Sequence, residues 1–260
     1  MAMIEELARK FANAVADEEK IPLATLEHNG LVPKSLEEAM AVQRAFVETS
    51  GKALAGWKLA IISDGRAVAA PMIDCYQIDA NSIASFPGQG ISALEVEICF
   101  TLAADIPAAT ATPFSRTDIL RHIDKVHLGV ELLAYRLAEK NQVPFPLFLA
   151  DRLANHSFVL GPEIDPAIVD IFAQGNDALT HLTVTEGTTT LFDSTVKHPA
   201  IDPLAPLVAF ANASLNTGGL LKRGQIMTTG SLCGAVPSSL DADTLVTLSP
   251  AGTLTLKPQK

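Results

Sequence analysis

Two glutamates, Glu95 and Glu97, stand two residues apart in a segment where apolar and polar residues alternate. The alternation from Ser92 to Ala103 predicts a β-strand, so both carboxylates leave the same face of that strand. Two carboxylates held side by side repel each other unless a cation lies between them, and Mg²⁺ prefers such oxygen ligands. The pair also fits the solvent-facing side of an ordinary amphipathic strand, so it does not settle the chemistry alone.

A third glutamate, Glu131, interrupts the apolar run from Val126 to Tyr135, which predicts another buried strand. A carboxylate in such a strand is costly to bury unless it is paired or bound to a metal ion. A salt bridge to Arg136 or Lys125, or a position on an exposed edge, would also account for it. Glu131 therefore joins the first two glutamates as a candidate metal ligand.

Lys58 is the only charged residue between Leu54 and Ile62, a run typical of a buried strand. Its ammonium could offset the charge of a substrate carboxylate or, if desolvated, exchange a proton near neutral pH. Alternatively, its aliphatic stem is buried and its charged end reaches water.

Composition narrows the class of protein. The chain has 260 residues, 48% of them hydrophobic, and its 29 acidic and 19 basic residues give a net charge of -10. This predicts one folded domain over residues 1–260 and no nucleic-acid partner. Three scattered cysteines and no signal-peptide pattern predict a cytoplasmic protein, and the lack of a long apolar run predicts no membrane partner. The high apolar content predicts a homo-oligomer.

Helices and strands alternate irregularly, which favours an α+β fold with a mixed, curled sheet. An apolar stripe from Ile4 to Val15 and a capping box at Ser35 predict two helices in an N-terminal segment, residues 1–52, packed on the domain. The proline-rich stretch Val143–Leu147 is interpreted as a surface loop beside the site. Further helices are expected at Pro113–Ile123, around Asp151 and at Pro203–Leu215, and further strands at Ser157–Leu160, His181–Thr185, Thr189–Asp193, Gln225–Thr229, Thr244–Leu248 and Thr253–Leu256.

Five segments carry a resemblance to known enzymes. In chain order they are GWKLAIIS, ALEVEICFTLAADIP, VHLGVELLAYR, LADRLANHSFVLGP and LLKRGQIMTTGSLCGAVP. Together they resemble the successive motifs of the 2-oxopent-4-enoate hydratase and 4-oxalocrotonate decarboxylase family, part of the fumarylacetoacetate hydrolase superfamily. The resemblance extends over roughly Ile4 to Leu256.

The resemblance implies a mixed β-roll of the fumarylacetoacetate hydrolase C-terminal type and a Mg²⁺ or Mn²⁺ ion held by Glu95, Glu97 and Glu131. It also implies a lyase, hydratase or decarboxylase, that acts on a small 2-oxo or 2-hydroxydienoic acid from aromatic catabolism. Such an acid would chelate the metal, which would stabilise its enolate, with Lys58 as the catalytic lysine. A complex with a paired pathway enzyme is also compatible with this family.

The chain departs from the family pattern at two acidic positions. Many members have an Asp-Ser-Arg run where this chain has Ala134-Tyr135-Arg136, and a Pro-Asp-Tyr-Gly loop where it has Pro71 to Asp74, with Met72 at the acid. Asp151 is therefore a candidate catalytic acid, and Asp74 a candidate substrate-binding residue.

Two further groups are candidates for substrate binding. Arg152 and His156 stand four apart, and on one helical face they would offer a cation and an imidazole to a substrate carboxylate; a solvated helix face is the alternative. The Thr229-Gly230-Ser231 turn offers backbone donors.

Two other functions stay open. An acylpyruvate hydrolase of the same superfamily would need a water-activating His and Glu, for which Glu27-His28 is the candidate. A non-catalytic partner subunit would keep the fold and the metal without activity.

Overall fold

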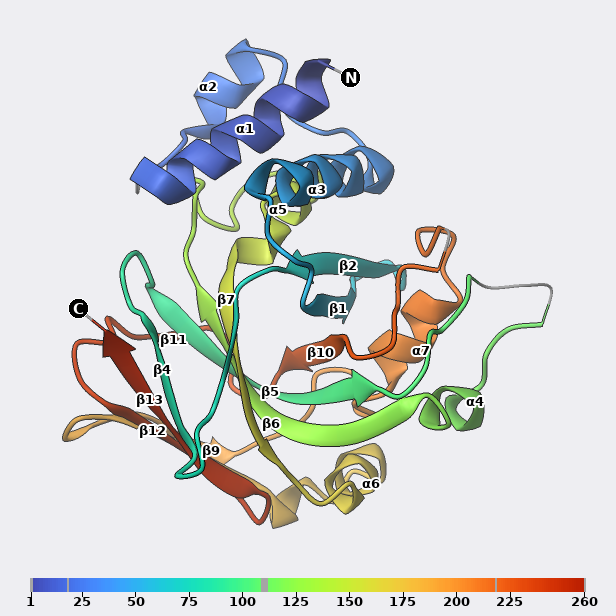
Figure 1. The fold of residues 1–260 in the computed structure, drawn as a ribbon, viewed down its shortest axis with the longest axis vertical. Helices are drawn as coiled ribbons and strands as arrows, with labels where there is room; N and C mark the ends of the chain where they lie inside the picture. Colours follow the sequence, from blue (N-terminus) through green and yellow to red (C-terminus); the bar gives the residue numbers. More distant parts are fainter. Residues whose placement is uncertain (1, 18, 109–111, 218, 260) are drawn as a thin grey trace.

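The protein is described by a computed structural model that covers residues 2–17, 19–108, 112–217 and 219–259. It combines helices with two β-sheets (Figure 1). The helices are α1 (Ala2–Asp17), α2 (Leu23–His28), α3 (Leu36–Ser50), α4 (Arg116–Leu120), α5 (Phe145–Ala150), α6 (Ala167–Ala173) and α7 (Ala205–Ala211), with short 3₁₀ turns at Arg152–Ala154 and Asp177–Leu179. The strands are β1 (Gly56–Ile61), β2 (Ala67–Met72), β3 (Cys75–Gln77), β4 (Ile83–Pro87), β5 (Ala93–Leu102), β6 (Ile123–Leu133), β7 (Asn155–Glu163), β8 (His181–Glu186), β9 (Thr189–Thr195), β10 (Ile226–Ser231), β11 (Val236–Pro237), β12 (Thr244–Ser249) and β13 (Gly252–Gln259).

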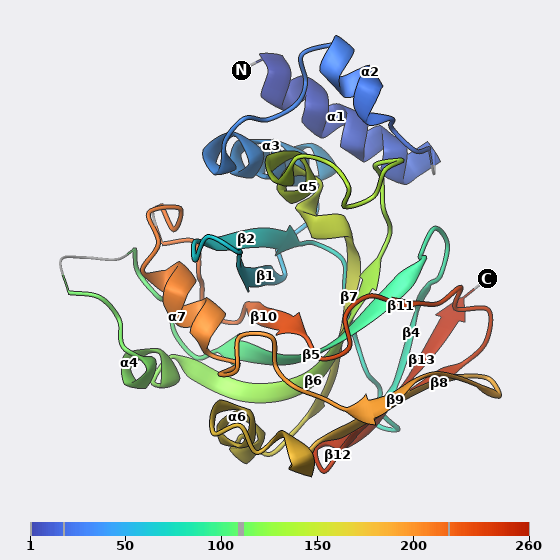
Figure 2. The same ribbon diagram turned by 180° about the vertical axis from the view of Figure 1, so that it is seen from behind.

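The larger sheet curls into a roll, as both ribbon views show (Figures 1 and 2). Among the described residues its strand order is β2-β1-β10-β5-β6-β7-β3, with β11 also paired to β5. The strands β1 and β10 run parallel, whereas β10, β5, β6 and β7 pair antiparallel. The smaller sheet has the order β4-β13-β12-β8-β9. The predicted α+β class with a mixed, curled sheet is confirmed.

The N-terminal helices pack on one side of the roll (Figure 1). Half of the predicted capping box at Ser35 is present, since its side chain accepts a hydrogen bond from the Glu38 amide at 3.2 Å. The Glu38 carboxylate accepts from the backbone N–H of Lys34 at 2.7 Å and not from that of Ser35. Helix α3 ends at Gly51, which has the left-handed φ of 63° that favours glycine. One cluster of buried hydrophobic residues runs from Leu7 in α1 to Leu256 in β13, so the core beneath these helices is continuous with that of the sheets.

Several predicted elements differ from the structure. The stretch Val143–Leu147 is not a surface loop, because Pro144 caps α5, and Leu147 in that helix is fully buried. Helix α7 is shorter than predicted at both ends. Six elements were not predicted from the sequence: α2, α6 and the strands β2, β3, β4 and β11. Strand β2 reads AVAAPM, and its alanines and proline carry little β-propensity although the whole strand is buried.

The structure also bears on membrane insertion. In the part of the chain that it describes, every helix is too short or too polar to cross a bilayer.

Gly56 allows β1 to approach β10, and this contact brings Lys58 level with Thr228. A Cβ at position 56 would lie 1.9 Å from the carbonyl oxygen of Ile226, a backbone atom that no side-chain rotation can move. We expect Gly56→Ala to lower the free energy of unfolding by roughly 3 kcal/mol, as measured by urea denaturation.

The control is Gly51→Ala, which meets no atom within 4 Å but keeps a left-handed φ of +63°. That strain costs only about 1 kcal/mol. Equal losses in the two variants would contradict the proposed close approach of β1 and β10.

Candidate metal centre

Two neighbouring strands, β5 and β6, place the predicted metal ligands on the interior face of the roll. Strands β5 and β6 pair so that Glu95 lies opposite Glu131 and Glu97 opposite Gly129. The ligand oxygens of the three glutamates all lie within 4.8 Å of one another. The sheet therefore brings together the three carboxylates that the sequence analysis selected.

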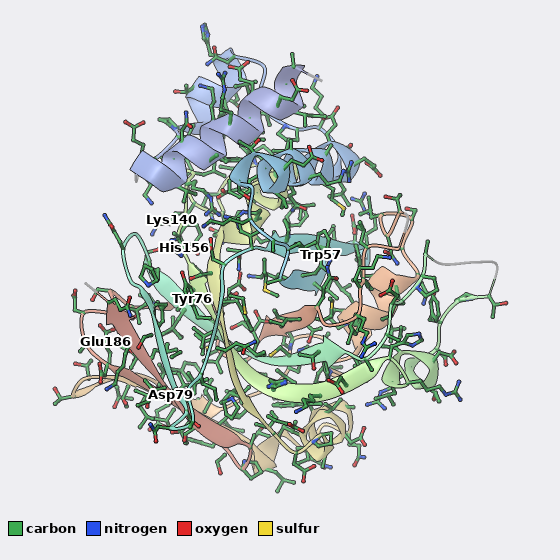
Figure 3. All side chains as sticks on the ribbon, in the orientation of Figure 1. Trp57, Tyr76, Asp79, Lys140, His156 and Glu186 are labelled. Atoms are coloured by element: carbon green, nitrogen blue, oxygen red, sulfur yellow. The ribbon has the colours of Figure 1, made fainter. Side chains whose placement is uncertain are left out.

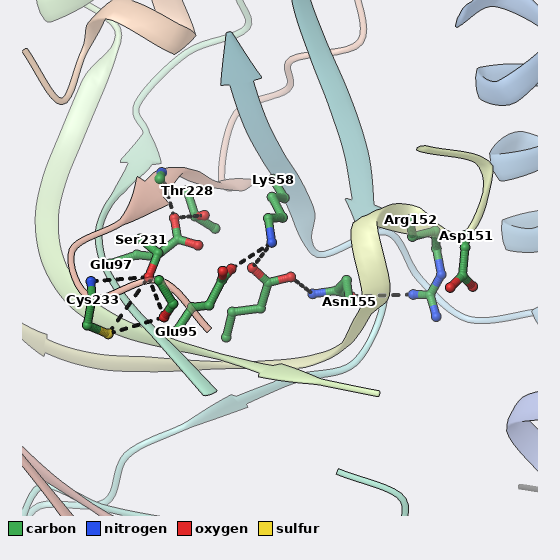
Figure 4. A network of polar contacts seen from close by, with 12 residues as sticks. Lys58, Glu95, Glu97, Asp151, Arg152, Asn155, Thr228, Ser231 and Cys233 are labelled. Atoms are coloured by element: carbon green, nitrogen blue, oxygen red, sulfur yellow. Dashed lines mark hydrogen bonds and ion pairs between the residues drawn. The ribbon is translucent and has the colours of Figure 1, made fainter. Parts of the chain in front are cut away.

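Lys58 completes the cluster from β1. Its Nζ lies 2.8 Å from Oε2 of Glu95 and 2.6 Å from Oε2 of Glu131, with 12% of the lysine side chain exposed (Figure 4). The alternative in which its charged end reaches bulk water is therefore wrong. The alternative partners of Glu131 are wrong too, because Arg136 pairs with Asp151 and Lys125 with Glu163.

Glu97 is fully buried, and only one of its two carboxylate oxygens has hydrogen-bond partners among the described residues. Its Oε2 accepts hydrogen bonds from the hydroxyl of Thr228 and, at 2.8 Å, from the backbone N–H of Gly230. Its Oε1 is buried and has no hydrogen-bond partner among the described residues. Cys99 on the same strand face is also fully buried, so the solvent-facing interpretation of this face is wrong.

The cluster contains three carboxyl groups and one ammonium, and burial and mutual charge shift the pKa values of all four. Burial raises the pKa of Glu97 and raises that of Glu131 further, although Lys58 opposes both shifts. Burial also acts to raise the pKa of Glu95, but the charge of Lys58 and the hydrogen bonds with Lys58 and Glu131 together outweigh it, and the pKa is lowered. Burial alone would lower the pKa of Lys58, yet the charges of Glu131 and Glu95 raise it. When fully ionised, three carboxylates against one ammonium leave two negative charges uncompensated.

A divalent cation fits this site. Three carboxylates supply hard oxygen ligands of the kind that Mg²⁺ and Mn²⁺ prefer. The partnerless Oε1 of Glu97 is a buried acceptor, whose burial is costly without a cation or donor. A bound divalent ion would also neutralise the two excess charges.

Asn155 connects the cluster to a second polar group, and the sequence analysis missed it as a site residue. Its Nδ2 donates to Oε1 of Glu131 at 2.9 Å, and its Oδ1 accepts from Nη1 of Arg152 at 3.4 Å (Figure 4). Asparagine in LADRLANHS gives no periodic signal, because it follows an irregular turn at the start of β7. Its role depends on that turn.

Arg152 does not share a helical face with His156, so that expectation is wrong. Arg152 and the next two residues have φ values of 55°, 53° and 63°, and His156 already belongs to β7. The Arg152 guanidinium lies 4.3 Å from the ring centroid of Phe46, and burial lowers its pKa to about 9, assisted by the charge of Arg136. Arg152 therefore acts within the protein interior.

Asp151 and Asp74 lie close enough to Arg152 for their charges to raise its pKa against the effect of burial. The carboxylate of Asp151 is buried and accepts a hydrogen bond from Nε of Arg136, and its backbone carbonyl accepts from Nη2 at 2.7 Å. Asp74 pairs with Lys52 at 2.8 Å. Their roles as catalytic acid and substrate ligand stay predictions.

The Thr229-Gly230-Ser231 segment, predicted as a turn, is the end of strand β10. The Thr229 side chain lies 3.4 Å from Nε2 of His198, whereas Thr228 and Gly230 contact Glu97. Ser231 donates to the carbonyl of Gly234 at 3.0 Å. The two-residue period of a strand would have identified Thr228, because it shares a face with Gly230.

Comparisons with known proteins bear on the fold. No family model and no curated protein sequence matches the chain. The 4-oxalocrotonate decarboxylase from Pseudomonas putida G7, complexed with calcium and acetate, matches with a TM-score of 0.75 and 16% identity over 99% of this chain and 98% of that one. The same enzyme complexed with magnesium and adipate gives 0.73 and 17% identity over 98% and 97%.

A second enzyme shares part of the architecture. Fumarylpyruvate hydrolase from Pseudomonas aeruginosa, in complex with Mn²⁺ and pyruvate, matches with a TM-score of 0.51 and 12% identity over 78% of this chain and 88% of that one. The chain therefore has the fold of the fumarylacetoacetate hydrolase superfamily, which confirms the fold implied by the sequence motifs.

The raised pKa values of Glu97 and Glu131 predict a pH-dependent effect of metal on stability. Such carboxyls stabilise the fold below their ordinary pKa of 4.5 and lose this contribution as the pH rises through the raised values. The shifts of Glu95 and Lys58 leave their contributions constant between these pH values. His156 and His198, whose pKa values burial lowers to about 4, add stability as the pH rises to about 6.5, so the prediction concerns the metal effect alone. We expect Mg²⁺ to raise the melting temperature more at about pH 8 than at about pH 5.

Differential scanning calorimetry with and without Mg²⁺ measures this difference. Glu131→Gln should abolish the extra stabilisation at high pH, whereas Glu163→Gln, whose parent side chain is 57% exposed, should preserve it. A Mg²⁺ effect that is equal at both pH values would contradict the assignment.

Proposed function

We propose that this protein is a divalent-metal-dependent lyase, a hydratase or a decarboxylase, acting on a small 2-oxo or 2-hydroxydienoic acid. The observation that carries the proposal is the position of the Lys58 ammonium among three interior glutamates, one of which has a partnerless buried oxygen. The fold shared with a decarboxylase of such acids supports it.

Glu95, Glu97 and Glu131 would hold Mg²⁺ or Mn²⁺, which supplies a Lewis acid to a chelating 2-oxo acid. Thr228 and the Gly230 N–H fix Glu97, so its Oε1 keeps one orientation. Asn155 fixes Glu131 in the same way. These contacts hold the ligand oxygens in place before the substrate arrives.

Lys58 would be the group that moves a proton. Its Nζ contacts two of the carboxylates, so an acid bound beside them would present its carbon 3 within reach of the same ammonium. In the hydratase reaction, the addition of water leaves an enolate that takes a proton at that carbon. In the decarboxylase reaction, the electrons released with CO₂ give a dienolate, and the proton goes to its oxygen. Lys58 would carry the proton in either case.

The two residues predicted to activate water in the hydrolase alternative do not lie at the glutamate cluster. Glu27 and His28 are exposed on α2, which lies in the N-terminal segment, remote from β5 and β6 in both ribbon views (Figures 1 and 2). The non-catalytic alternative would not require a lysine among the glutamates. The lyase is therefore the better proposal.

The metal requirement is tested by titration calorimetry with pyruvate. We expect pyruvate to bind the wild-type protein only with Mg²⁺ or Mn²⁺, and Glu97→Gln to weaken this binding about a hundredfold because it removes a charged ligand. Glu163→Gln, an exposed glutamate of the same sheet, is the matched control. Pyruvate binding that persists without metal would sink the proposal.

Proton transfer is tested separately by deuterium exchange. In D₂O with Mg²⁺, the wild-type protein should exchange the methyl protons of pyruvate, followed by NMR, and Lys58→Met should slow this exchange by about a hundredfold or more. Lys58→Met should still bind pyruvate, because the three glutamates remain. Unchanged exchange in this variant would reject Lys58 as the proton carrier, and a wild-type protein that binds without exchange would favour the non-catalytic alternative.

A further inference from the structure

Arg152 is a buried cation that no step of the proposed function uses. Its side chain is 3% exposed, and its guanidinium lies over the ring of Phe46 in α3. Among the described residues, this side chain has one hydrogen-bond acceptor, Oδ1 of Asn155, which lies 3.4 Å from Nη1. A charge is costly to bury, so the single polar contact of the guanidinium indicates what the charge does.

The backbone that carries the guanidinium is strained. The three residues from Arg152 to Ala154 all have left-handed φ values, 55°, 53° and 63°, which L side chains rarely adopt. All three are buried, and such strain persists only where the surroundings fix it. Asn155 follows directly and opens β7, and the next residue, His156, lies between the N-terminal helices and the sheets (Figure 3). The turn thus places the guanidinium against the first side chain of a strand.

The neighbours of Asn155 allow only one orientation of its amide. Asn155 is fully buried, its Nδ2 donates to Oε1 of Glu131 at 2.9 Å, and its Oδ1 faces Arg152 (Figure 4). A guanidinium can only donate hydrogen bonds, and an ionised carboxylate can only accept them. A flipped amide would set its oxygen against the carboxylate and its NH₂ group against the guanidinium. Arg152 therefore excludes the orientation in which Asn155 could not hold Glu131.

Glu131 gains a fixed carboxylate from this contact. Asn155 holds Oε1, and the ammonium of Lys58 lies 2.6 Å from Oε2, so both oxygens have a partner that sets their direction. A ligand that is oriented before the cation arrives favours binding. Residues that orient metal ligands from behind typically change the metal affinity by about 10- to 100-fold when they are replaced.

We propose that Arg152 is a positioning residue of the metal centre, which holds the Asn155 amide in the orientation that fixes Glu131 for a divalent cation. The inference rests on the proposed metal-dependent function. It assigns Arg152 a role other than the substrate contact predicted from the sequence. It also makes the metal affinity depend on α3, because Phe46 of that helix packs against the guanidinium.

Titration with Mn²⁺, followed by the electron paramagnetic resonance signal of the free ion, measures this role without substrate. Arg152→Met removes the cation and its donor, whereas Arg152→Lys keeps the cation but ends one bond short of Nη1. We expect each variant to weaken Mn²⁺ binding about tenfold or more. Arg121→Lys, whose parent side chain is 72% exposed, should keep the wild-type affinity. Arg152→Lys keeps the test decisive if loss of the buried charge prevents folding.

A double-mutant cycle separates this role from general destabilisation. Asn155→Leu removes the amide at similar volume and should also weaken Mn²⁺ binding. With the amide gone, Arg152 has nothing to orient, so adding Arg152→Lys should cause no further loss.

Nuclear magnetic resonance reads the amide directly in metal-free protein labelled with ¹⁵N-asparagine. The side-chain signals of Asn155 are identified by their absence in Asn155→Leu. They should shift in Arg152→Lys, because the contact with Oδ1 is lost, and stay unchanged in Arg121→Lys.

The outcomes separate the two proposals. Wild-type Mn²⁺ affinity in Arg152→Lys, or losses that add in the double variant, would overturn the positioning role and leave the metal-dependent function standing. Asn155 signals that do not respond to Arg152→Lys would overturn it as well. If the wild-type protein binds no Mn²⁺, the proposed function and this inference both fail.

Discussion

Three carboxylates and one ammonium share the interior of the larger sheet, where little water is available to solvate them. Their close approach is tolerable only because each charge has specific partners: Lys58 between Glu95 and Glu131, and Thr228 with Gly230 beside Glu97. Even so, the negative charge is incompletely balanced. The need for a cation and the orientation of Lys58 both follow from this imbalance.

The curl of the sheet creates this arrangement, and small residues permit it. Gly129 lies opposite Glu97, where a Cβ would come within 2.4 Å of the Phe158 ring. Gly56 similarly permits the parallel contact between β1 and β10. Because these positions lack side chains, strands from distant parts of the chain can converge on one set of carboxylates.

Polar contacts continue from the cluster toward the N-terminal helices. Asn155 links Glu131 to Arg152, and Arg152 stacks on Phe46 of α3. Three consecutive residues with left-handed φ, beginning at Arg152, make the turn that allows this path. Strained backbone of this kind persists only where the surroundings fix it, and here α3, α5 and β7 surround the turn. The N-terminal segment is thus coupled to the site and also covers the roll.

The local sequence determined the elements with strong periodic or capping signals. The alternation around Glu95, the apolar run around Glu131 and the serine cap of α3 each depend on near neighbours in the chain, so they could be read without a structure. The isolated charge of Lys58 in an apolar run was informative for the same reason. By contrast, β2 carries alanines and proline whose burial depends on α3 and β1, and its sequence gives no strand signal.

Only the tertiary structure decided which partner each charged group has. Arg136 and Lys125 are five and six residues from Glu131 in sequence, yet they pair with Asp151 and Glu163. Lys58, more than seventy residues away, pairs with Glu131. Strand register and sheet curl set these pairings, and neither is encoded in the spacing of residues along one strand. The same holds for Arg152 and His156, which an irregular turn separates although their spacing fits a helix. The residue types therefore determined the available chemistry, and the packing of distant strands decided where each group acts.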